Sequence, residues 1–258
     1  MIIFRCDTRR FAVTPLHAFV EGLGVALLLP FALATAASAQ PTESSQMAPA
    51  DQLRAAAVDA FGTSAPVTQT RDGKEVVVKA EQVVWTRLGP VLIASVTMKQ
   101  GCEDCTGGLD IYYFEDSSEG LLLRRKFPDA IEGSSAGKPP IRWSLDDRFL
   151  GGPVLRTVAE GAWQGCTTTA VSLTELTPDG PVARGSAPIG WSDASGDDKA
   201  VGRIANIVRG KSFDIVYSGT RAFTDHYQLA NGAFSMAGEQ RLSGCARLLL
   251  ETDRGSQP

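Results

Sequence analysis

The sequence predicts an all-β protein built mainly of antiparallel sheets, arranged as a sandwich or as open, stacked β-units, with one short N-terminal helix. Short apolar or alternating runs rich in β-branched and aromatic residues recur along the chain. Turn residues separate these runs, in agreement with 26 Gly and 14 Pro in 258 residues. The runs do not alternate with long amphipathic helices, as a parallel α/β sheet would require.

The first 39 residues have the pattern of an export signal. Basic residues, among them Arg9 and Arg10, precede an apolar run over residues 22–34, and Ala37-Ser38-Ala39 forms a small-residue cleavage site. We therefore expect a periplasmic or extracellular protein that begins at or near Gln40 and keeps 219 residues. The export route stays open, because paired arginines also occur in twin-arginine signals.

The composition of the mature chain limits its partners. Without the signal, 22 Lys and Arg stand against 27 Asp and Glu with no basic run, so we expect no nucleic-acid partner. No later stretch approaches the roughly 20 apolar residues of a spanning helix, so no membrane span is expected after signal cleavage. One histidine and four cysteines remain, and no motif indicates a cofactor.

A polar, proline-bearing segment over residues 40–50 is expected to be a flexible lead-in to a single β-rich domain over residues 51–258. A short helix begins this domain, with Asp51 as its cap and Gly62 at its end. Its apolar face consists of residues four apart, Leu53, Ala57 and Phe61. We expect this face to pack against a sheet.

Strands joined by tight turns fill the rest of the domain. The expected strands cover residues 76–78, 82–88, 91–98, 109–114, 154–158, 169–176, 204–208 and 213–217. Hairpin turns are expected at Asp72-Gly73, Pro178-Asp179-Gly180 and Asn231-Gly232, since glycine takes the positive φ that other residues resist.

Two segments repeat short motifs in the same order. Gly-Pro-Val-Leu begins at residues 89 and 152, Gln-Gly-Cys at residues 100 and 164, and Pro-Ile-x-Trp-Ser at residues 140 and 188. We interpret them as duplicated β-units near residues 75–147 and 148–205, with reuse of turn chemistry in unrelated hairpins as the alternative. Repetition favours a core position for the tryptophans over a sugar-binding platform; they are Trp85, Trp143, Trp163 and Trp191.

The four cysteines of the mature chain predict two disulfides in an oxidising compartment. Two carboxylates separate Cys102 from Cys105, which opposes the reactive thiolate of a redox catalyst. A tight turn brings such residues within bonding range, so we expect a structural Cys102–Cys105 bond. The second pair is then Cys166–Cys245, with a crossed arrangement such as Cys102–Cys166 as the alternative.

Two further groups of residues could carry chemistry. His226 follows Asp225, but neighbouring strand residues point to opposite faces, and no Gly-x-Ser-x-Gly nucleophile motif occurs. Asp193, Asp197 and Asp198 form a loop that offers oxygen ligands to a hard cation, without the spacing of the known calcium loop. We expect a surface histidine and an acidic loop tip, with general-base and metal roles as the alternatives.

The sequence leaves two classes of function open. Few imidazoles and no nucleophile or metal motif favour a non-catalytic binding or envelope-associated module of unknown ligand. The alternative is a secreted hydrolase that uses His226 or a pair of carboxylates, and 27 carboxylates offer too many pairings to choose among. Neither a catalytic residue nor a ligand is predicted.

Overall fold

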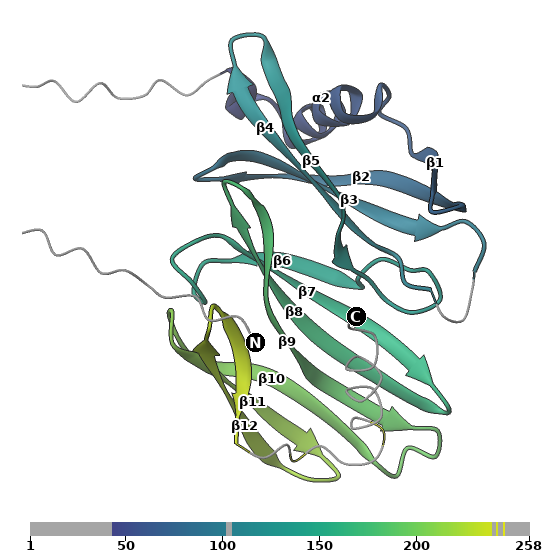
Figure 1. Ribbon diagram of the computed structural model, residues 1–258, viewed down its shortest axis with the longest axis vertical. Coiled ribbons are helices and arrows are strands. Elements are labelled where there is room, and N and C mark those ends of the chain that lie inside the picture. Colours follow the sequence, from purple (N-terminus) through teal and green to yellow (C-terminus); the bar gives the residue numbers. More distant parts are fainter. Residues whose placement is uncertain (1–42, 102–104, 239–240, 242–244, 246–258) are drawn as a thin grey trace, which may run out of the picture. The chain divides into compact units, whose positions relative to one another are not determined.

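The computed structural model describes residues 43–101, 105–238, 241 and 245 (Figure 1). The expected export signal and Cys102 lie outside the described residues. Two antiparallel sheets make up most of the fold, which confirms the predicted fold class. Two helices precede them, α1 (Glu43–Gln46) and α2 (Pro49–Phe61), and none in the described part of the chain is long and apolar enough to cross a membrane.

Each sheet is a meander, because every strand pairs with its neighbours in the chain. The first sheet contains β1 (Val67–Arg71), β2 (Lys74–Thr86), β3 (Gly89–Met98), β4 (Gly108–Ser117) and β5 (Gly120–Glu132). The second contains β6 (Arg142–Asp146), β7 (Val154–Trp163), β8 (Cys166–Thr177), β9 (Gly180–Asp193), β10 (Lys199–Val208), β11 (Ser212–Gly219), β12 (Phe223–Ala230) and β13 (Ala233–Ala237). Tight hairpin turns permit this order, since antiparallel strands need no crossover helix.

The expected hairpin turns are present. Asp72 and Gly73 join β1 to β2 with φ of 48° and 76°, and Asn231 and Gly232 join β12 to β13 with φ of 52° and 82°. Gly180 begins β9 with φ of 138°. Positive φ at these positions is the conformation that the Asp-Gly and Asn-Gly pairs were expected to adopt.

The helix α2 begins three residues earlier than expected. Its N-cap is Ala48, which makes no side-chain cap hydrogen bond, so the prediction that Asp51 caps the helix is wrong. Pro49 stands in the first turn, where the missing N–H costs nothing because that position has no helical acceptor. At the other end Gly62 has a left-handed φ of 78° and donates its N–H to the Val58 carbonyl, as predicted.

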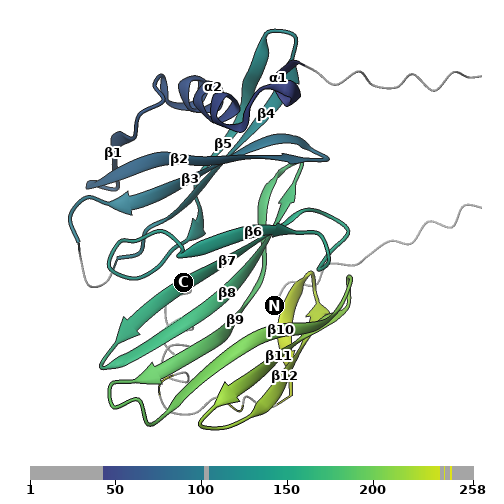
Figure 2. The ribbon, with the colours of Figure 1, turned by 180° about the vertical axis from the view of Figure 1, so that it is seen from behind.

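The first sheet is covered on both faces, which explains the continuous apolar run in β3. Ala56 and Ala60 of α2 join the core on one face, and both views of the ribbon show α2 over this sheet (Figures 1 and 2). On the opposite face, Leu155 of β7 and Leu176 of β8 join the core. All residues of β3 from Pro90 to Val96 are therefore buried, whichever face they point to.

The second sheet bends until its last strand returns to β9. Gly185 of β9 has φ of 122°, and a Cβ at this position would collide with the Phe234 carbonyl of β13. Beside it, Arg184 donates a hydrogen bond to the Gly232 carbonyl at 2.9 Å. The enclosed core is aromatic, with ring contacts among Phe149, Phe213, Tyr227 and Phe234.

The repeated Trp motifs lie in different structural positions. Trp143 is half-buried in β6, an edge strand, whereas Trp191 is 6% exposed in β9, inside the same sheet. Trp85 is 39% exposed and donates its indole N–H to Gln52. A core position therefore holds for Trp191 and not for Trp85, the side chain of Trp163 lies outside the described atoms, and duplication stays a hypothesis.

Candidate functional site

The Cys166–Cys245 disulfide is present, with Cα atoms 5.3 Å apart, and it ties the start of β8 to the C-terminal segment. Cys105 is also disulfide-bonded, and its partner lies outside the described residues. The pairing of Cys102 with Cys105 therefore stays a prediction. Bonded sulfurs offer no thiolate for catalysis or metal binding.

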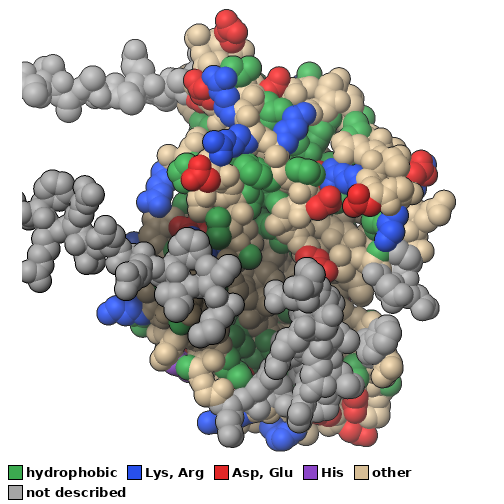
Figure 3. All heavy atoms as spheres, viewed as in Figure 1, with side chains coloured by type: hydrophobic (Ala, Val, Ile, Leu, Met, Phe, Trp, Pro, Cys, Tyr) green, Lys and Arg blue, Asp and Glu red, His purple; other side chains and the backbone are tan. Residues whose placement is uncertain are grey.

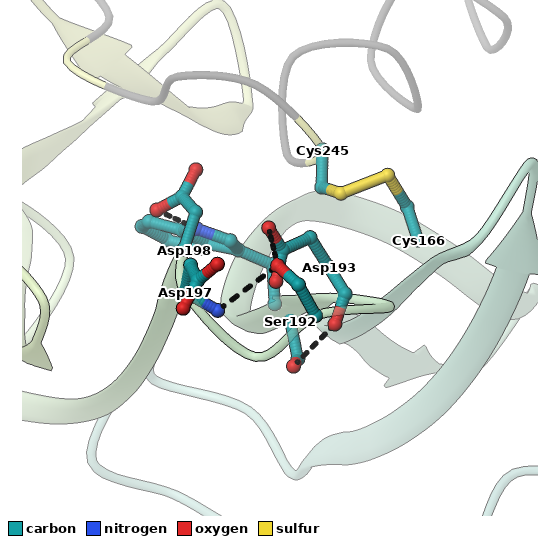
Figure 4. Close-up of a disulfide and its surroundings, with 8 residues drawn as sticks. Cys166, Ser192, Asp193, Asp197, Asp198 and Cys245 are labelled. Atoms are coloured by element: carbon teal, nitrogen blue, oxygen red, sulfur yellow. Dashed lines mark hydrogen bonds between the residues drawn. A yellow bond between two sulfur atoms is a disulfide. The ribbon is translucent and has the colours of Figure 1, made fainter.

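The acidic loop lies beside this disulfide, and the carboxylates of Asp193 and Asp198 accept hydrogen bonds from neighbouring side chains (Figure 4). Ser195 donates a hydrogen bond to Asp193 at 2.9 Å, and the Trp191 indole donates one to Asp198 at 3.2 Å. Burial raises the pKa of Asp193, but hydrogen bonds from Ser195 and from loop amides lower it further than burial raises it. Within the described ranges, no group of three His, Cys, Asp or Glu side chains, Asp197 included, is placed to hold a metal ion.

His226 lies on the outer face of β12, while the preceding Asp225 is buried, so the two side chains point apart as predicted. His226 contacts the carboxylate of Asp214 on β11 instead, with Nδ1 and Oδ1 2.6 Å apart. Asn206 donates a hydrogen bond to the other oxygen of Asp214 at 2.7 Å. The hydrogen bonds from Asn206 and His226 lower the pKa of Asp214.

A buried ion pair lies inside the first sheet. Asp110 is fully buried and accepts two hydrogen bonds from Arg71, at 2.6 and 2.9 Å, and one from the Tyr112 hydroxyl at 2.8 Å. A pocket of about 350 Å³ opens beside it, but Arg71 also donates to Gln69 and Asp129. Its guanidinium is thus occupied, and the cluster serves the fold.

A different pocket, of about 370 Å³, lies where β10 separates from β9 after only three paired residues. Three arginines from three strands line it, Arg142 of β6, Arg156 of β7 and Arg203 of β10. We call it the arginine pocket. Its other lining residues are Trp143, Ser144, Val158, Val171, Ile189, Gly202 and Ile204.

Strand register places Arg142 and Arg156 on the same face of the sheet. Arg142 stands opposite Val158, and Ser144 stands opposite Arg156, in the antiparallel pairing of β6 with β7. Because side chains two residues apart share a face, Arg156 points the same way as Val158, which belongs to the core of this sheet. Val171 pairs with Val158 from β8 and continues the apolar floor.

The opposite wall comes from β10, where Gly202 precedes Arg203. A Cβ on Gly202 would lie 2.7 Å from Ile215 and 2.9 Å from the Tyr217 ring. The absence of a side chain there lets the backbone of β10 lie directly against these two residues of β11. Gly202 and Ile204 therefore face the pocket, whereas Arg203, which pairs with Val216, points to the outer face of β10 and is exposed at the rim.

The three arginines have no partner within the fold. None forms a hydrogen bond or ion pair with another described residue, and no Asp or Glu lines the pocket. By contrast, Arg184 pairs with Glu175 at 2.6 Å, and Arg148 pairs with Asp146 at 2.7 Å. The pKa of Asp146 is lowered chiefly by its hydrogen bond from Arg148, and Arg156 adds only a smaller Coulomb effect.

Sequence reasoning did not single out these arginines, although a weak signal exists. Arg142 stands two residues before Ser144, and Arg156 stands two residues before Val158. In an extended strand, each arginine therefore shares a face with that neighbour. A charge on an inward-facing strand position is unusual and suggests a site. The sequence alone, however, does not tell which face of β6 and β7 is turned toward the core. That follows only from the pairing of the two strands and from the position of β10 in the folded sheet.

Charge elsewhere on the molecule is mixed. On the face shown in Figure 3, Lys and Arg side chains are interspersed with Asp and Glu, so the unpaired arginines are a local feature. Comparison with known protein families, curated proteins and solved structures finds no match for this chain, and the arginine pocket is therefore identified by its geometry.

Proposed function

We propose that the protein is an exported, non-catalytic binding module that holds an anionic ligand in the arginine pocket. One observation carries this proposal: Arg142 and Arg156 share the face of β6 and β7 that lines the pocket, no Asp or Glu lines it, and neither arginine forms a hydrogen bond or ion pair with another described residue. The proposal keeps the class of function that the sequence favours and adds a site to it.

Electrostatics supports an anionic ligand. Arginine remains charged at all ordinary pH values, and its planar fork of donors matches oxyanions such as carboxylate, sulfate and phosphate. Two like charges on one face repel each other, and a bound anion replaces that repulsion with charge-assisted hydrogen bonds. The core residues Val158 and Val171 give the pocket an apolar floor, and low local polarity strengthens such bonds.

The hydrolase reading has one observation in its favour, the chain of hydrogen bonds from Asn206 through Asp214 to His226. A carboxylate that orients an imidazole is found in general-base catalysis. In the described residues, however, no hydroxyl or thiol is hydrogen-bonded to the His226 ring, so a nucleophile is not in place. We therefore propose this reading only as the second candidate.

Binding of chromogenic probes tests the proposal. We expect 4-nitrophenyl phosphate and 4-nitrophenyl sulfate to bind in equilibrium dialysis, and the neutral 4-nitrobenzyl alcohol not to bind. Arg142→Gln with Arg156→Gln should weaken anion binding by at least about tenfold, whereas Arg209→Gln, in the exposed β10–β11 turn, should leave it unchanged. Unchanged binding in the double variant would refute the site, and release of 4-nitrophenolate that is lost in His226→Gln would favour the hydrolase.

A further inference from the structure

We infer that Asn231 is a site of spontaneous covalent modification, at which the side-chain amide is lost and isoaspartate or aspartate remains. Asn231 lies in the turn between β12 and β13 and is followed by Gly232. The inference is independent of the proposed function, because Asn231 does not line the arginine pocket. It depends on the exposure of the turn, on the residue that follows Asn231 and on the contacts of its amide.

The reaction needs water as its only co-reactant. The backbone nitrogen of Gly232 forms a bond to Cγ of Asn231, the bond from Cγ to Nδ2 breaks, and the proton of the backbone amide leaves with Nδ2 as ammonia. Water then adds its hydroxyl to one of the two carbonyl carbons of the five-membered imide, and the ring nitrogen leaves that carbon with the second proton. Opening at Cγ gives aspartate, whereas opening at the main-chain carbonyl carbon gives isoaspartate.

The turn presents both reacting groups to solvent. Asn231 and Gly232 are exposed, with φ of 52° and 82°. Gly232 carries no Cβ, so its nitrogen can approach Cγ of Asn231 without steric hindrance. The Asn231 side chain forms no hydrogen bond with another described residue, and its amide is therefore not held away from this nitrogen.

The chain contains a matched comparison, because its sequence has two asparagines, Asn206 and Asn231. Both are exposed and both have left-handed φ, which is 49° at Asn206. Asn206, however, precedes Ile207, whose branched Cβ crowds the backbone nitrogen. The Asn206 amide also donates a hydrogen bond to Asp214 at 2.7 Å. The following residue and the contact of the amide therefore distinguish the two sites, and backbone φ does not.

The position of the turn at the edge of the sheet allows the reaction in the folded protein. The paired strands hold the turn in one conformation, so the attack requires the hairpin to open locally. β13 has five residues, is the last strand in the sheet order and is hydrogen-bonded to β12. Opening of such an edge hairpin costs less free energy than global unfolding. We therefore expect Asn231 to react more slowly than in an unstructured peptide of the same sequence, and faster than Asn206.

Isoaspartate should disturb β13, because it adds one carbon atom to the main chain of a two-residue turn. The pairing of Ala230 with Ala233 closes this turn. Beyond it, Phe234 is 4% exposed in the aromatic core, and the Gly232 carbonyl accepts the hydrogen bond from Arg184. Aspartate, by contrast, keeps the length of the main chain. Isoaspartate should therefore reduce stability more than aspartate does.

Peptide mapping of the folded, oxidised protein tests the inference. The protein is incubated at neutral pH and physiological temperature and digested with trypsin, which places the two asparagines in separate peptides, residues 204–209 and 222–241. Asn231 should convert at least about tenfold faster than Asn206, because glycine leaves the attacking nitrogen unhindered and isoleucine crowds it. Protein that is digested without incubation gives the background. In the Asn231→Gln control, the longer side chain forms a larger ring less readily, so position 231 should stay unmodified.

Two results would overturn the site. One is equal conversion of both asparagines. The other is no conversion of Asn231 in the folded protein while a synthetic peptide of residues 227–236 converts under the same conditions.

Thermal unfolding tests the effect on β13. Ion exchange separates the deamidated protein from the unmodified protein by its added negative charge, and fragmentation of peptide 222–241 measures the share of isoaspartate. The isoaspartate-containing fraction should unfold at least about 3 °C below the Asn231→Asp variant, which carries the same charge on an ordinary backbone. Equal unfolding temperatures would overturn the inferred effect of isoaspartate on β13.

Discussion

At the residue scale, charged side chains divide into those that are paired within the fold and those that are not. Asp110 and Arg71 represent the first group, because an ion buried this deeply needs a partner and hydrogen bonds to offset the loss of hydration. Arg142 and Arg156 represent the second group, since neither forms a hydrogen bond or ion pair with another described residue. This contrast within one molecule is the ground on which we propose the arginine pocket as a site.

Loss of Asp110 should be among the most damaging single changes. Asp110→Ala leaves Arg71 and the Tyr112 hydroxyl without their shared acceptor, so the free energy of unfolding should fall by about 4 kcal/mol. Replacing both charges, in Arg71→Met with Asp110→Leu, should recover at least half of this loss. Urea denaturation measures both, and a loss below about 1 kcal/mol in Asp110→Ala would contradict the account.

Asp214 should give stability a dependence on acid pH. Its pKa is lowered by hydrogen bonds from Asn206 and His226, so the unfolded state takes up protons first as pH falls. The stabilising effect is thus fully present above the unfolded pKa of about 3.9 and is lost as pH falls through the lower folded value. Asp214→Asn should cost about 1 kcal/mol at pH 6, and this cost should decrease as pH falls through the lowered folded pKa, while the exposed Asp147→Asn should cost little at any pH.

At the element scale, the return of β13 to β9 depends on one glycine. Gly185→Ala adds a Cβ where the Phe234 carbonyl lies and also requires positive φ, so it should reduce stability by about 3 kcal/mol. Gly196→Ala is the matched control, because Gly196 has φ of 76° but open space around it, and it should cost about 1 kcal/mol. Thermal or urea denaturation compares the two, and equal losses would show that close approach does not hold this part of the sheet.

The strands that sequence patterns predict are those with buried, β-branched runs. β3 and β8 are clear because burial on their faces selects apolar residues, and the expected strands 76–78 and 82–88 merge into β2 across a bulge between Ala80 and Gln82. The strands that were not expected are β1, β5, β6, β9, β12 and β13. β5 is an edge strand with three consecutive charges, and β12 buries Asp225 where the alternation calls for an apolar residue.

At the scale of the whole molecule, the Cys166–Cys245 bond joins residues 79 apart in the chain. A ring of this length restricts the unfolded chain, so Cys166→Ser with Cys245→Ser should lower the free energy of unfolding by about 4.5 kcal/mol. Urea denaturation of the oxidised protein and of the double variant measures the difference. A change below about 1 kcal/mol would show that the bond does not constrain the unfolded state.

Composition and turn chemistry predict the fold class and the long disulfide, while the candidate site depends on three-dimensional contacts. Arg142 and Arg156 are brought to one face by the register of β6 with β7, and the pocket beside them opens where β10 separates from β9. Neither relationship is local in sequence. The residues that sequence did single out, His226 and Asp193 among them, are engaged with neighbours in the fold.

The most direct test of the arginine pocket is a two-dimensional NMR titration of the arginine Nε–Hε resonances with 4-nitrophenyl phosphate. The account predicts saturable shifts of Arg142 and Arg156 that fit one Kd, with Arg209 and the paired Arg71 unmoved. Shifts that are confined to other arginines, or that grow linearly without saturation, would contradict it.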